Sequence, residues 1–113
     1  MHAQNVDSAE SLVKAAALGA WIELDAIREG TLEKHLDYAK VLHEAGYGGQ
    51  ILLSHDGNSM RLTGKPPRQY EMLFIEFIPM LKKSGLGAEV DRWTMTNPAR
   101  AFSINKRLMK AGR

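Results

Sequence analysis

The stretch that decides the fold is residues 50–54, which read QILLS. Its three central residues are all aliphatic, and the run is too short for a helix of ordinary length. Such a run is typical of a strand buried on both faces, as in parallel sheets. His55 and Asp56 follow directly, at the end of the strand where functional residues of α/β folds lie. In extended chain their side chains point to opposite faces.

A second strand is predicted upstream of this run. At Ala20–Asp25 apolar side chains alternate with larger or acidic ones, as on a strand with two different faces. A helix capped by Asp7 and ended by Gly19 is predicted before it. An amphipathic helix at Leu32–Ala45 connects the two strands. This order predicts an α/β fold with parallel strands and a crossover helix.

The C-terminal half is predicted to be helical after a long loop. The loop runs from Asn58 to Arg68, and the helix Gln69–Lys83 must kink or divide at Pro79. A short helix at Ala88–Thr94 and a last helical turn capped by Asn97 follow. Two strands this apolar cannot cover their own faces and edges, so the pattern indicates part of a larger α/β sheet or barrel.

Composition narrows the class of protein. The chain has 113 residues, 44% of them hydrophobic and 25% charged, which is typical of one soluble domain. No apolar run approaches the roughly 18 residues of a membrane helix, and no signal peptide is visible, so we expect a cytoplasmic protein by default. The absence of cysteine excludes disulfides and thiolate zinc sites. A net charge of +2 is too weak a bias to indicate a nucleic-acid or membrane partner.

Several polar residues are candidates for chemistry. Asp56 could bind a metal or act as a base on metal-bound water, or it could cap the turn that follows the strand. His2, judged by its position alone, is an N-terminal histidine without a local reason to be a ligand. Arg61, Lys65 and Arg68 fall in the long loop and could bind an anionic substrate group, or form a solvated basic loop.

Two carboxylates share one face of the predicted first strand. Glu23 and Asp25 lie on the face of Trp21, where they could hold a metal ligand or a basic group in place. The alternative is that Glu23 pairs with a lysine or arginine of a neighbouring strand. His35 and His43, on the amphipathic helix, are expected to face solvent or an interface rather than to bind a metal.

Four motifs, in this order and spacing, resemble a known family. They are GAWIELDAI at residues 19–27, QILLSHD at 50–56, FIPML at 77–81 and TNPAR at 96–100. From His2 to about Ile104 the chain resembles the C-terminal part of the phosphotriesterase family of the amidohydrolase superfamily.

The resemblance implies a (β/α)8 TIM barrel with two metal ions, usually zinc, at the C-terminal ends of its strands. Residues 1–113 would be the C-terminal part of this barrel domain, its last two to three βα units, with strand seven at Ala20–Asp25 and strand eight at Ile51–Ser54. His2 then matches a metal ligand. Asp56 matches the aspartate that binds metal and accepts a proton when metal-bound hydroxide attacks an ester, lactone or phosphoester.

Departures from the family pattern refine these expectations. Ala26 stands where organophosphate-hydrolysing members have a histidine, and Asn5 lies near the position of a second relay carboxylate. The pattern resembles more closely the broader phosphotriesterase-homology group, some of whose members act on lactones. The His-x-His of strand one, the bridging residue of strand four and the histidine of strand five are not in this chain, so its zinc ligand set is incomplete.

Two functional readings follow. In the first, the chain is a fragment of a metal-dependent hydrolase, inactive by itself and in need of the missing barrel half. In the second, it is a catalytically inactive remnant that associates with itself and has no metal chemistry. A small nucleic-acid-binding module is disfavoured by the low net charge.

Overall fold

The computed structural model of the chain describes residues 2–28, 30–55 and 71–104. Two parallel strands form its sheet, β1 (Ile22–Leu24) and β2 (Ile51–Leu53), with Ile22 opposite Ile51. The predicted mixed α/β fold with parallel strands is confirmed, and each strand is shorter than predicted. The predicted loop Asn58–Arg68 lies outside the described residues.

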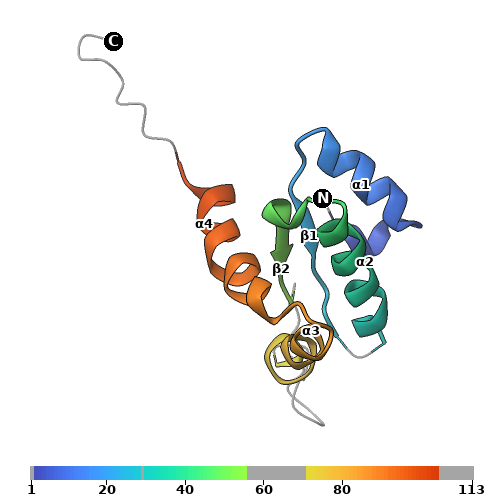
Figure 1. Cartoon of the computed structure of the whole chain (residues 1–113), viewed down its shortest axis with the longest axis vertical. Coiled ribbons are helices and arrows are strands. Elements are labelled where there is room, and N and C mark those ends of the chain that lie inside the picture. The colour runs from blue at the N-terminus through green and yellow to red at the C-terminus, as the bar shows by residue number, and fades with distance from the viewer. Residues whose placement is uncertain (1, 29, 56–70, 105–113) are drawn as a thin grey trace, which may run out of the picture.

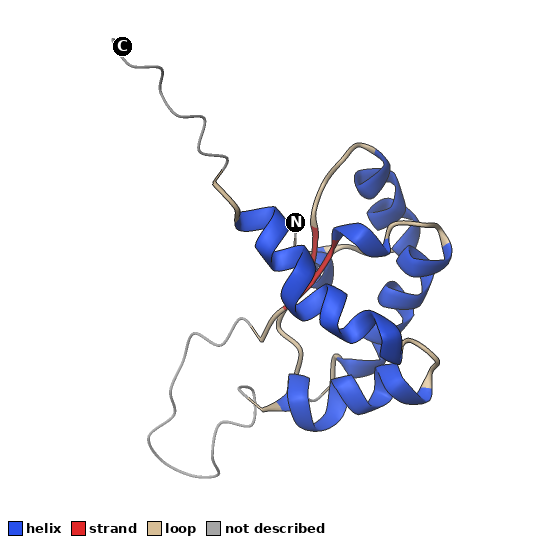
Figure 2. Cartoon of the chain, turned by 60° about the vertical axis from the view of Figure 1, so that its left-hand side comes forward, coloured by secondary structure: helices blue, strands red, loops and turns tan. Residues whose placement is uncertain are grey.

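Helices surround the two strands. Helix α1 (Ala9–Ala17) precedes β1, and α2 (Leu32–Glu44) connects β1 to β2 as the predicted crossover. Figure 1 shows both helices on one side of the strands and α4 on the other, and Figure 2 shows the strands enclosed between helices. The buried apolar side chains of strands and helices form one core, which includes Leu12, Ile22, Leu24, Ile27, Leu42, Ile51, Phe77, Leu81 and Trp93.

Helices α3 (Ile78–Lys83) and α4 (Asn97–Phe102) each continue from a π-helical segment, Leu73–Phe77 and Arg92–Thr96 respectively. The sequence predicted a kink or a new segment at Pro79. In the structure the helical stretch is continuous, and its change from π-helix to α-helix lies at Ile78, directly before Pro79. The predicted short helix and last turn are instead one continuous helical stretch from Val90 to the end of α4.

Both predicted helix caps differ from the structure. Ser8, not Asp7, caps α1, since its side chain accepts a hydrogen bond from the backbone N–H of Ser11. Asn97 is the first residue of α4 rather than its cap. Its buried amide instead donates to the carbonyls of Gly48 and Ile51, at 2.9 Å each, and so joins α4 to the beginning of β2.

The prediction that His35 faces solvent or an interface is wrong. His35 is completely buried, and its Nδ1 donates a hydrogen bond to the carbonyl of Thr31 at 2.8 Å. It precedes Ala39 by four residues and Leu42 by seven, so helical spacing places it on the same buried stripe. Burial lowers the pKa of His35, and the ring is therefore neutral at pH 7.

Among the helices of the described ranges, none is both long enough and apolar enough to cross a membrane.

Candidate metal centre

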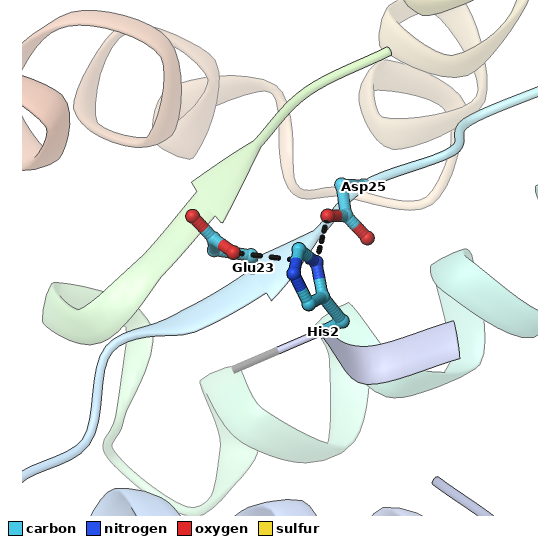
Figure 3. A group of neighbouring side chains, drawn as sticks. All are labelled: His2, Glu23 and Asp25. Atoms are coloured by element: carbon cyan, nitrogen blue, oxygen red, sulfur yellow. Dashed lines mark hydrogen bonds and ion pairs between the residues drawn. The ribbon is translucent and has the colours of Figure 1, made fainter. Parts of the chain in front are cut away.

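The N-terminal segment brings His2 to the sheet. His2 forms an isolated parallel bridge with Glu23, so its backbone lies beside β1 on the edge opposite β2. Figure 3 shows the His2 ring over β1, on the far side from β2. Backbone pairing thus holds residue 2 beside the strand, where local sequence predicts a frayed end.

Two carboxylates, one in β1 and one directly after it, lie against this ring. Glu23 and Asp25 are two residues apart, and strand geometry places both on one face. Asp25 accepts a hydrogen bond from Nδ1 of His2, and an oxygen of Glu23 lies 3.5 Å from the same nitrogen. The predicted carboxylate pair therefore holds a basic group, and within the described ranges that group is His2 (Figure 3).

Burial distinguishes the three side chains. The Asp25 side chain is only 4% exposed, whereas Glu23 is 31% and His2 is 56% exposed. The hydrogen bond to Asp25, and then the charge of Asp25, raise the pKa of His2, to which Glu23 adds a smaller effect. The second oxygen of Asp25, Oδ1, is buried and has no hydrogen-bond partner among the described residues.

The backbone around Asp25 is held on both sides. Ser54, just after β2, donates its N–H to the carbonyl of Leu24 at 3.1 Å and accepts from Ile27 at 3.4 Å. Between them Ala26 has a positive φ of 53°, an unusual conformation for a residue with a side chain. Its carbonyl accepts a hydrogen bond from the Thr31 hydroxyl at 2.9 Å, which stabilises the turn.

The donor set fits a divalent cation. One ligand atom from each of His2, Glu23 and Asp25 lies within 4.8 Å of the others. Imidazole nitrogen and carboxylate oxygen are both zinc ligands, and catalytic zinc commonly keeps three protein ligands and one water. The buried Asp25 Oδ1 is a further oxygen without a partner in the described ranges.

The described residues do not include the other predicted site residues. Asp56, Arg61, Lys65 and Arg68 lie outside the described residues. His55 accepts a hydrogen bond from the backbone N–H of Leu73 at 3.3 Å, and its half-buried ring packs beside Phe74. Burial lowers the pKa of His55, which keeps the accepting nitrogen free of a proton at neutral pH.

The sequence pattern predicted the carboxylate pair but not that His2 is its partner. The sequence contains only part of the information that would identify this partner. The parity of positions 23 and 25 gave their common face, but only the parallel register beside β1 reveals which residue of the N-terminal segment lies opposite Glu23.

Comparison with known families gives one match. The sequence model of the phosphotriesterase family matches residues 1–102, nearly the whole chain. No curated protein and no solved structure matches the chain.

Proposed function

The chain belongs to the phosphotriesterase family, whose members are metal-dependent hydrolases, and on that premise we propose that it is the C-terminal part of such an enzyme. Residues 1–113 would supply the last two to three βα units of a (β/α)8 barrel, with β1 as strand seven and β2 as strand eight. The parallel pairing of β1 with β2, and of His2 with β1, supports this arrangement.

One observation carries the proposal: His2 is bridged to Glu23 of β1, beside the carboxylate of Asp25 at the C-terminal end of that strand. Active sites of (β/α)8 barrels lie at the C-terminal ends of strands. We propose His2 and Asp56 as metal ligands, since residue 56 follows β2 after two residues. A divalent metal, most simply zinc, would supply Lewis-acid activation of water for attack on an ester, a lactone or a phosphoester.

The remaining roles fall to residues of this chain. Asp56 would accept the proton of the attacking water. Arg61, Lys65 and Arg68 would bind an anionic group of the substrate, because guanidinium and ammonium groups are the usual protein partners of carboxylate and phosphate. The small-molecule substrate would be an anionic lactone or ester.

The chain alone would be almost inactive. A barrel needs about 250 residues, and the family's remaining metal ligands belong to earlier strands. The incomplete ligand set would bind metal weakly and would need the missing half for turnover.

Metal titration tests the ligand assignment. We expect the intact chain to bind Zn²⁺ in calorimetry, and His2→Ala and Asp56→Ala each to weaken binding at least tenfold. His43→Gln is the matched control, because His43 packs beside Trp93 and is not part of the cluster. Unchanged binding in both alanine variants would refute the proposed centre.

Activity tests the fragment assignment. The DNA upstream of the Met1 codon should encode, in frame, roughly 200 residues with a His-x-His after an early strand. Expression of that longer protein should give lactone or ester hydrolysis that Asp56→Ala abolishes. A stop codon directly upstream, or hydrolysis of the same rate by the 113-residue chain alone, would refute the fragment assignment.

Substrate charge is tested separately. In the longer protein, replacement of both Arg61 and Arg68 by Ala should reduce turnover of anionic lactones and leave neutral lactones unaffected. Equal rates on anionic substrates before and after replacement would remove the proposed role of these residues.

A second candidate function is a self-associating protein without catalysis. Large apolar side chains are exposed on the helices, including Phe74, Met95 and Phe102 at 62%, 67% and 70%. Such surfaces favour association with a second copy or with another chain.

A further inference from the structure

We propose that Asp25 is a positioning residue, whose buried carboxylate holds His2 in the tautomer that keeps its proton on Nδ1 and presents Nε2 to a divalent metal ion. This inference rests on the proposed function, because it takes His2 as a metal ligand. It adds a residue, Asp25, that acts through His2.

The hydrogen bond determines the tautomer. An ionised carboxylate can only accept, so Nδ1 of His2 donates to Asp25. A neutral imidazole with its proton on Nδ1 has its lone pair on Nε2, and only a lone pair can bind a metal. Histidine ligands of metals commonly donate their other ring N–H to a carboxylate, which fixes the ring and raises its basicity.

Asp25 is better placed for this role than Glu23. Both carboxylates face the same nitrogen, but Glu23 lies 3.5 Å away and is 31% exposed, so water competes for it. Asp25 is 4% exposed and makes the closer contact. In a site of low dielectric constant a hydrogen bond to a charged group is stronger than in water.

The strand keeps Asp25 in position. Backbone hydrogen bonds from Ser54 to Leu24 and from Ile27 to Ser54 flank Asp25 on both sides. Leu24 and Ile27 are both completely buried, which fixes the backbone further. In contrast, the His2 side chain is 56% exposed, so the ring depends on Asp25 for its orientation.

The pair Asp25→Asn and Glu23→Gln tests the proposal, because each replaces a carboxylate by the amide of equal size. An asparagine can either accept from Nδ1 or donate to it, so Asp25→Asn should no longer specify one tautomer. We expect Zn²⁺ affinity of the 113-residue chain to fall about 10- to 100-fold in Asp25→Asn and less than about threefold in Glu23→Gln.

A second readout does not depend on metal. Nitrogen-15 NMR of metal-free protein, above the pKa of His2, should show the Nδ1-protonated tautomer in the unmodified chain and in Glu23→Gln. It should show a mixture in Asp25→Asn. A structural role alone would not change the tautomer, and circular dichroism identifies a variant that fails to fold. The measurement on the unmodified chain needs no variant.

The outcomes separate the inference from the proposed function. Loss of Zn²⁺ affinity in His2→Ala but not in Asp25→Asn overturns the inference and leaves the proposed function standing. A protonated Nε2 in the unmodified chain overturns it as well. Equal losses in Asp25→Asn and Glu23→Gln overturn it in favour of direct metal binding by both carboxylates. Unchanged affinity in His2→Ala overturns the proposed function and the inference together.

Discussion

At the scale of single residues, Asn97 has a structural role that its type did not reveal. Asparagine before proline is typical of a helix cap. Here the side chain is completely buried and donates to two carbonyls, of Gly48 and Ile51, across more than 40 residues of chain. Trp93 donates to the same Gly48 carbonyl at 2.9 Å, so both side chains hold the backbone that precedes β2 in place.

We expect Asn97→Ala to lower the free energy of unfolding by about 2–4 kcal/mol, since it leaves a small cavity and removes two buried hydrogen bonds. Urea denaturation measures the change. Ser103→Ala is the control, because Ser103 is exposed and bonds only the nearby Arg100 carbonyl in the described ranges, and it should stay within about 0.5 kcal/mol. Equal small losses in both variants would contradict this role.

His35 makes stability depend on pH. Burial lowers its pKa in the folded chain below the unfolded value of 6.5, so the unfolded state binds the proton more readily. The stabilising effect is complete above pH 6.5 and is lost as the pH falls from there toward the folded pKa. Between pH 7.5 and 5 the free energy of unfolding should fall less steeply in His35→Gln than in the unmodified chain, by at most about 1.4 kcal/mol per pH unit.

Urea denaturation across that pH range measures the difference between the two slopes. The comparison isolates His35, because the other shifted histidines are the same in both proteins. The pKa of His55 is also lowered and adds stability of the same sign, whereas the raised pKa of His2 contributes stability that is lost as pH rises. Parallel pH profiles for His35→Gln and the unmodified chain would contradict the assignment.

At the scale of elements, proline explains why two helices contain π-helical segments. Pro79 and Pro98 each lie second in a helix that continues from such a segment. A proline ring clashes with the carbonyl four residues earlier and donates no hydrogen bond to it. Widening of the preceding turn accommodates the ring without ending the helix. The sequence predicted an interruption at Pro79, but not that the helix would continue through it after a π-helical turn.

The cap of α1 gives an element-scale prediction. Ser8→Ala should cost about 1 kcal/mol of stability, because the N–H of Ser11 loses its acceptor. Asp7→Ala, one position earlier, should cost less than about 0.5 kcal/mol. Thermal or urea unfolding of the two variants compares them directly. A larger loss of stability in Asp7→Ala than in Ser8→Ala would indicate that Asp7 caps α1, as the sequence pattern predicts.

At the scale of the whole molecule, the exposed apolar side chains predict association. Phe102 and Met95 are exposed on the helical stretch that packs beside β2, and Leu18, which follows α1, is 89% exposed. Figure 1 shows α1 and α4 on opposite sides of the strands. If the second candidate function holds, sedimentation velocity should show masses above 12.6 kDa that rise with concentration.

Phe102→Glu should then raise at least tenfold the protein concentration at which half of the chains are associated. Leu18→Glu should change that concentration little. Both side chains are exposed, so neither replacement should affect folding. A monomer at every concentration would contradict self-association.

The sequence by itself determined the family, the parallel α/β order and the crossover helix. These depend on local periodicity and on motif order, which short-range hydrophobic patterns encode. It also indicated that Glu23 and Asp25 share a face, because strand alternation is strict. The strand ends and helix caps do not follow from such patterns, since they depend on a few hydrogen bonds rather than on a repeat.

Only the tertiary structure decided which groups meet. The contact of His2 with Asp25 joins residues 23 positions apart, and it follows from a strand register that no local pattern contains. The buried amide of Asn97 and the buried ring of His35 have the same origin. The amide nitrogen of Asn97 and the Nδ1 of His35 can be buried because distant backbone carbonyls or a neighbouring turn accept their hydrogen bonds, and those partners are set by packing rather than by local sequence.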